Sequence, residues 1–200
     1  MSARDDVLSR IRKAVAGAEP AEDVPRDYRA SYDVGNVVDH FADMVADYKA
    51  TVRRVGRVDL AAVVAEEVGG RRVGVPAGLP TEWYAGIDAV VDAPPLSIPE
   101  LDQLDGAVTG ARLGIAETGT IVLDGGGRSG RRAITLVPDW HLCIVEASQV
   151  VGSVPQAVMT LEPRVPITFI SGPSATSDIE LNRVEGVHGP RTLNVLIVDD

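Results

Sequence analysis

Three short polar segments that contain glycine are the parts of this sequence whose residue types could do chemistry. They run from Gly114 to Thr120, from Ser171 to Glu180 and from Gly186 to Pro190. Each lies against an apolar run that has the pattern of a buried strand. Loops at strand ends gather ligand groups in open α/β sheets, so these hydroxyls and backbone N–H groups suit a small anion. The ligand-binding candidates are Glu117, Thr118, Gly119, Thr120, Ser171, Gly172, Ser174, Thr176, Asp178 and His188.

The segment that begins at Ser171 is the most suggestive of the three. An apolar strand over residues 167–170 runs into a loop rich in Gly, Ser and Thr, which is predicted to open a helical turn at Ser177. Such a turn points N–H groups and hydroxyls at one place, as phosphate and carboxylate sites require. The segment lacks the glycine spacing of a dinucleotide fingerprint and the Gly-Lys-Ser of a phosphate loop. A tight turn closed by a serine cap explains the spacing equally well.

Single residues in these segments have both a structural and a chemical interpretation. Glu117 follows an apolar run, where a carboxylate is either hydrogen-bonded by its neighbours or shifted in pKa for chemistry, and the spacing favours the first. His188, between two glycines, is a site residue or a surface turn. Asp178 can equally be a first-turn acid that favours a helix dipole. Gly119 and Gly172 are expected to let a ligand approach the backbone. The Gly-x-Ser-x-Gly elbow is absent, so we do not expect serine hydrolase chemistry.

Composition excludes several classes of protein. With 200 residues and a net charge of −10, the chain is predicted to form one main domain and shows no basic stripe for nucleic acid. Arg128, Arg131 and Arg132 stand together among glycines, as a solvated loop or, alternatively, as a loop that faces an anion or a partner. The one cysteine, Cys143, lies in an apolar run and is predicted to be a buried structural thiol.

No metal and no cofactor are expected in this chain. One cysteine excludes an internal disulfide and a four-thiolate metal site, and the three histidines have no ligand spacing. The N-terminus has no long apolar stretch of the signal-peptide type, and no run approaches 18 apolar residues. We therefore expect a cytoplasmic protein.

The elements that would position the candidate residues divide into two parts. Residues 1–35 are predicted to form a helix, with Val7, Leu8, Ile11 and Val15 on one face, followed by an irregular connector. This helix is a candidate arm for docking on a partner or a sister subunit. Residues 36–200 are predicted to form a single α/β domain.

In that domain, alternating strands and helices predict a Rossmann-like open sheet with helices on both faces. After Gly106 the strands follow one another through short loops, which makes the sheet mixed. The strands expected there span 107–115, 120–123, 133–137, 142–146, 167–170 and 193–198.

Taken together and in this order, the three polar segments closely resemble the signatures of the LUD-domain family. The residues that carry the resemblance are Gly114-Ile115-Ala116-Glu117-Thr118-Gly119-Thr120, Ser171-Gly172-Pro173-Ser174 with Asp178-Ile179-Glu180, and Gly186-Val187-His188-Gly189-Pro190. Thr109-Gly110-Ala111, Pro138 and His141 also fit. The resemblance covers residues 108–198 closely and is looser before Gly70.

The resemblance implies properties that the spacing does not show. The fold would be that of sugar-phosphate isomerases, CoA transferases and formyltetrahydrofolate cyclo-ligases. The role would lie in bacterial oxidation of L-lactate to pyruvate by a three-protein iron–sulfur system, with this chain as a non-redox component beside iron–sulfur partner proteins. The alternative is an independent enzyme that acts on an acyl-CoA or a phosphorylated metabolite. Some CoA transferases of this fold group use a glutamate nucleophile, which makes Glu117 the one catalytic candidate.

Overall fold

The centre of the molecule is a parallel sheet of six strands. The computed structural model describes residues 2–18, 26–27, 31, 35–177, 183–185 and 188–199. In the order β1-β12-β7-β4-β2-β3, every neighbouring pair of strands is parallel. The strands are β1 (Thr51–Gly56), β12 (Thr192–Asp199), β7 (Trp140–Glu146), β4 (Gly106–Gly110), β2 (Val73–Val75) and β3 (Ala89–Val91).

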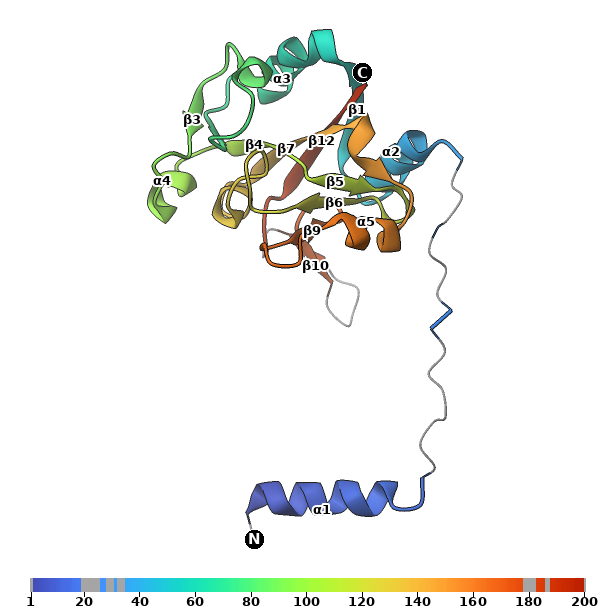
Figure 1. Ribbon diagram of the computed structural model, residues 1–200. Coiled ribbons are helices and arrows are strands. Elements are labelled where there is room, and N and C mark those ends of the chain that lie inside the picture. Colours follow the sequence, from blue (N-terminus) through green and yellow to red (C-terminus); the bar gives the residue numbers. More distant parts are fainter. Residues whose placement is uncertain are drawn as a thin grey trace.

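A smaller sheet of four strands lies beneath the central one in Figure 1. Its order is β8-β5-β6-β9, in which β6 is antiparallel to both of its neighbours. The strands are β8 (Val150–Val151), β5 (Leu113–Ile115), β6 (Thr120–Leu123) and β9 (Thr168–Ile170). A separate antiparallel pair joins β10 (Ala175–Ser177) to β11 (Arg183–Glu185).

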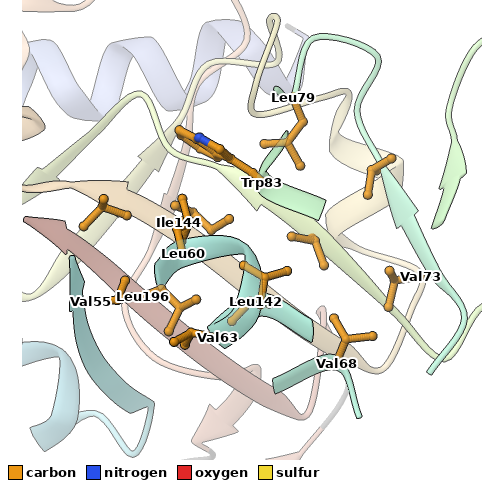
Figure 2. Packing of buried hydrophobic residues seen from close by; sticks show 14 of the residues in the cluster. Val55, Leu60, Val63, Val68, Val73, Leu79, Trp83, Leu142, Ile144 and Leu196 are labelled. Atoms are coloured by element: carbon orange, nitrogen blue, oxygen red, sulfur yellow. The ribbon is translucent and has the colours of Figure 1, made fainter. Parts of the chain in front are cut away.

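Alternation of apolar side chains along the central strands gives the sheet two buried faces. On one face, α3 (Leu60–Val68) packs Leu60 and Val63 against residues such as Leu142 and Ile144 of β7 (Figure 2). The α3 helix ends at Gly69, whose backbone is left-handed (φ +57°), a conformation that glycine adopts at low cost. This face needs no polar side chains, because parallel strands covered by helices are buried throughout.

The opposite face is covered by α2 (Val37–Asp47) and by the small sheet. Phe41 and Val45 of α2 pack with Val145 of β7 and with Ile121 of the small sheet. The outer face of the small sheet is covered in turn by α5 (Val154–Thr160), through Ala157. Helices thus lie on both faces, and the predicted α/β class with an open mixed arrangement is confirmed.

Short helices make up the remaining regular structure. The α4 helix (Ile98–Asp102) begins at a capping box between Ser97 and Glu100. The 3-10 segments are η1 (Arg57–Asp59), η2 (Thr81–Tyr84), η3 (Ala116–Thr118), η4 (Arg132–Thr135) and η5 (Ala147–Gln149).

The N-terminal helix α1 (Ala3–Val15) begins at Ser2, whose side chain forms a capping box with Asp5. None of its residues is buried. Val7, Ile11 and Val15 are each more than half exposed, so the apolar face of this helix has no cover among the residues that the structure describes.

Two predicted strands are wrong in detail. The run over 107–115 is two strands in different sheets, because Ala111 donates its N–H to Ile144 of the central sheet and Arg112 donates its N–H to Val122 of the small one. The run over 133–137 contains η4 instead of a strand, because its N–H groups bond three residues back, as from Ile134 to Arg131.

The helical turn predicted at Ser177 is also wrong. Ser177 is the last residue of β10 and pairs with Arg183 of β11. The Gly/Ser/Thr-rich segment therefore leads into a β-hairpin. As far as Ser177, the described part of this segment contains no helix N-terminus.

Candidate functional site

A cleft of about 490 Å³ lies where β9 of the small sheet meets the amino ends of β7 and β12. Its walls are residues 167–174, the loop 188–190 and the segment around η4, and its floor includes His141 and Leu193. The cleft thus lies at the carboxyl end of β9. For the central sheet the cleft is at the opposite edge, because β9 and the loop after it fold back over the start of β7.

The second and third polar segments meet in this cleft. Ser171, Gly172, Ser174 and His188 all line it. The Ser174 hydroxyl accepts a hydrogen bond from the His188 backbone N–H at 2.9 Å, and the Ser174 N–H donates to the Pro190 carbonyl at 2.8 Å. These bonds hold the two loops together and turn the Ser174 hydroxyl toward the third segment.

The first polar segment reaches the cleft only through a chain of hydroxyls. Thr118 and Thr120 share a hydrogen bond of 2.7 Å between their hydroxyl oxygens, and Thr120 shares one of 2.8 Å with Ser171. The Thr120 side chain is 6% exposed and does not itself line the cleft. These two threonines, which do not line the cleft, thus orient the hydroxyl of Ser171, which does.

Glu117 is not brought to the cleft. Its carboxylate accepts a hydrogen bond from the Val154 backbone N–H at 3.3 Å, at the first residue of α5. Its own N–H donates to the Gly152 carbonyl at 3.0 Å. A carboxylate at a helix N-terminus satisfies a backbone donor that has no partner within the helix. The geometry supports this structural role and gives Glu117 no access to a ligand in the cleft.

Gly119 and Gly172 serve the packing of α2. Both have positive φ values, +57° and +81°. A Cβ atom on Gly119 would lie 2.6 Å from the Met44 carbonyl oxygen, and one on Gly172 would lie 2.5 Å from the Tyr48 carbonyl oxygen. The close approach that these glycines permit is therefore to the end of α2. Gly172 also lines the cleft, whereas Gly119 does not.

For two further candidates, no side-chain contact is described. Thr176 lies in the middle of β10, opposite Val184. Asp178 lies outside the described residues.

Arg132 is the arginine that the structure places at the cleft. Its guanidinium donates to the Thr168 hydroxyl at 3.0 Å, and both residues line the cavity. Arg128 instead pairs with Glu146 at 2.7 Å and stacks on Trp83, while Arg131 forms a bidentate pair with Asp92. Among the described residues that line the cleft, none is an aspartate or a glutamate.

His141, on the floor of the cleft, was not among the residues predicted to bind ligand. Its side chain is 1% exposed, and burial lowers the pKa of the imidazole to about 4, so the ring is neutral at pH 7. The Nε2 atom lies 2.8 Å from the Thr109 hydroxyl. His141 stands inside an apolar run, and it lines the cleft together with residues of β9 and of the loop that follows β9.

Cys143 follows His141 by two residues in β7, on the same face of the strand, and is fully buried. Burial raises the pKa of its thiol to about 12, so the sulfur stays protonated, as a structural thiol does. No group of three or more His, Cys, Asp or Glu that could hold a metal ion is found within the described ranges.

The described lining of the cleft therefore includes one arginine, several hydroxyls and the neutral imidazole of His141 beside apolar side chains. The LUD domain model matches residues 98–198, which is half of the chain and includes all three polar segments. The chain belongs to the LUD-domain family. The resemblance of the three segments to this family is thereby confirmed.

LUD-domain relatives extend the match along the chain. "Lactate utilization protein C" of Deinococcus radiodurans is 43% identical over 98% of this chain and 95% of its own length. A protein of the same name from Shouchella clausii is 37% identical over 52% of this chain and 48% of its own. A crystal structure of a DUF162 family protein from Deinococcus radiodurans superposes with a TM-score of 0.72, at 37% identity, over 83% of this chain and 99% of that one. In the described part of this LUD-domain chain, no helix is long and apolar enough to cross a membrane.

Proposed function

We propose that this chain is a non-redox component of an iron–sulfur system that oxidises L-lactate to pyruvate, and that it binds a small carboxylate in the cleft. The observation that carries the proposal is Arg132, a guanidinium placed at a cleft whose described lining contains no acid, in a chain of net charge −10. Hydrogen bonds from a guanidinium to a carboxylate are about twice as strong as neutral ones. Ser171 and Ser174 add hydroxyls beside it.

The placement in lactate metabolism rests on relatives that bear the name "Lactate utilization protein C". The non-redox role rests on the single, buried Cys143, because a cluster needs several thiolates. In this proposal the clusters belong to iron–sulfur partner proteins, and the present chain supplies a ligand site, a docking surface or both.

Titration calorimetry of the purified chain with L-lactate and with pyruvate tests the ligand site. Arg132→Met should weaken binding of either carboxylate by about tenfold or more, the scale of a charge-assisted hydrogen bond. Arg164→Met is the matched control, since Arg164 is exposed and does not line the cleft. Equal loss in both variants, or no binding of either carboxylate to the wild type, would remove the cleft from the proposal.

A second function is favoured by the size of the cleft. A volume of about 490 Å³ lies in the range of sites for ligands much larger than a three-carbon acid. An independent enzyme that acts on an acyl-CoA or a phosphorylated metabolite would use this extra space. Turnover of acetyl-CoA or of a sugar phosphate by the purified chain alone would favour this second function. Turnover of lactate only in the presence of iron–sulfur partners would favour the first.

A further inference from the structure

The free edge of a β-strand borders the cleft. The strand is β9, which lies at one end of the small sheet and pairs with β6 alone among the described strands. Thr168 and Ile170 point to one face of this sheet, and Phe169 points to the other. All three line the cleft, as do Ile167 before them and Ser171 after them. Because residues of both faces border the same space, that space runs along the edge of the strand.

The backbone of Phe169 points to this free edge. The Val122 carbonyl accepts a hydrogen bond at 2.8 Å from the N–H of Arg112, which directly precedes β5, so the backbone groups of Val122 face β5. In an antiparallel sheet the N–H and C=O of one residue point to the same side, and the side alternates along the strand. Val122 is opposite Phe169, so this pair exchanges no hydrogen bond, and the N–H and C=O of Phe169 point away from β6. Among the described residues, none outside the small sheet bonds either group.

A positive charge lies at the amino end of this edge. The Arg132 guanidinium donates at 3.0 Å to the hydroxyl of Thr168, the first residue of β9. A strand added antiparallel to β9, as β6 is, would run toward Thr168 and end beside Arg132. Antiparallel pairing is slightly more stable per residue than parallel pairing. The geometry therefore brings the carboxyl end of an added strand to the cation.

Apolar side chains flank the same edge. Phe169 is 53% exposed and Leu136 is 39% exposed, and both line the cleft together with Pro190. They offer apolar contacts to alternate side chains of an added strand. A cleft of about 490 Å³ has room for a short end of a chain, but not for a folded domain.

We infer that the cleft binds the carboxyl-terminal tail of a partner protein as an added strand on β9. The N–H and C=O of Phe169 pair with the backbone of the tail, and Arg132 binds its terminal carboxylate. In complexes of this kind the main-chain bonds give affinity, and the contacts of alternate side chains give specificity. The inference rests on the proposed carboxylate site at Arg132 and names a partner for it. The tail and a small carboxylate then compete for the same guanidinium.

Fluorescence anisotropy with a labelled peptide tests the inference. The probe is a short peptide of alternating valine and threonine, with fluorescein at its amino end and a free carboxylate at the other. It should bind the wild-type chain about tenfold more tightly than its carboxyl amide does, the scale of a charge-assisted hydrogen bond. Arg132→Met should remove this difference. Arg164→Met, at an exposed position outside the cleft lining, should keep it.

Methylation of single backbone nitrogens of the peptide tests the added strand in the wild-type chain. Methyl groups on the nitrogens that face β9 should each weaken binding about fivefold, whereas methyl groups on the intervening nitrogens, which point away, should change it less than about twofold. In the protein, Phe169→Pro should bind the peptide about fivefold more weakly than Phe169→Ala. Both variants lack the ring, and only the alanine variant keeps the N–H at the edge. An outward N–H is the place where an edge strand tolerates proline.

The outcomes separate this inference from the proposed function. Equal affinity of the free acid and the amide, an equal effect of methylation at every nitrogen, or no peptide binding up to about 1 mM overturns the added strand. If L-lactate still binds the wild type and Arg132→Met weakens it, the proposed ligand site stands without the tail. Peptide binding with the expected alternation, in a chain that does not bind L-lactate or pyruvate, supports the tail and removes the small ligand from the cleft.

Discussion

The Ser174 hydroxyl accepts a hydrogen bond from the His188 backbone N–H at 2.9 Å, across 14 positions of sequence. This bond joins two loops that each line the cleft, one after β9 and one before β12. The same hydroxyl oxygen keeps a second lone pair and its own hydrogen, which leaves it able to contact a ligand. Ser174 therefore has a part in shaping the cleft as well as in any contact with an anion.

Replacement of Ser174 by alanine should weaken binding of L-lactate by roughly 1 kcal/mol, about fivefold, and should change the melting temperature little. The stability effect is small because His188 is exposed, so water can take the place of the lost acceptor. Calorimetry and thermal unfolding measure the two quantities. Ser148→Ala, at an exposed position in η5, is the control. If Ser174→Ala unfolds the chain or leaves lactate affinity unchanged, Ser174 is not a ligand contact.

Glu117 should behave in the opposite way. Glu117→Ala removes the carboxylate that caps α5 at Val154, so the free energy of unfolding should fall by about 1 kcal/mol while L-lactate affinity stays the same. Glu117→Gln keeps an acceptor oxygen and should lie between the wild type and the alanine variant. Urea unfolding and calorimetry separate the two effects. A large loss of lactate binding in Glu117→Gln, with normal stability, would instead place this carboxylate among the ligand contacts.

The contrast between Ser174 and Glu117 shows what the sequence could predict. The strand before Ser171 and the short loop around His188 are local features, so an apolar run predicts the first and the flanking glycines predict the second. The direction in which Glu117 points depends on α5, which follows it by more than 30 residues. No local pattern reports that contact.

The same limit explains the parts of the site that the sequence did not reveal. His141 lies in an apolar run whose pattern indicates only a buried strand, and the residues that line the cleft with it are distant in sequence. Arg131 pairs with Asp92, whereas Arg132, its neighbour in the sequence, lines the cleft. The contacts of Gly119 with Met44 and of Gly172 with Tyr48 also join residues that are distant in sequence, so no local pattern predicts them.

Deletion of residues 1–20 should leave the melting temperature of the domain nearly unchanged, because no residue of α1 is buried. The exposed apolar residues Val7, Ile11 and Val15 recur at helical spacing, so their loss should weaken association with iron–sulfur partner proteins, if this face is the docking surface. Co-purification of tagged full-length and truncated chains with these partners measures the effect. The triple variant Val7→Ser, Ile11→Ser, Val15→Ser should reproduce it. A truncated chain that unfolds would make the helix part of the core.

Burial of His141 predicts a pH dependence of stability. The imidazole has a pKa of about 4 in the folded chain and an ordinary value of 6.5, so the unfolded state binds more protons between these two values. The free energy of unfolding should therefore fall as the pH drops from about 6.5 to 4, by roughly 3 kcal/mol for this group alone. Above pH 7 the ring is neutral in both states, and its contribution should not change.

Urea unfolding of the wild type and of His141→Phe, at intervals between pH 7.5 and pH 4.5, isolates this contribution from that of the carboxylates. The difference in unfolding free energy between the two chains should be constant above pH 7 and should shift in favour of the variant as the pH falls, because phenylalanine has no proton to gain. His40→Gln, on α2 and away from the cleft, controls for loss of a histidine as such. Parallel profiles for the wild type and His141→Phe would mean that the ring can be protonated in the folded state.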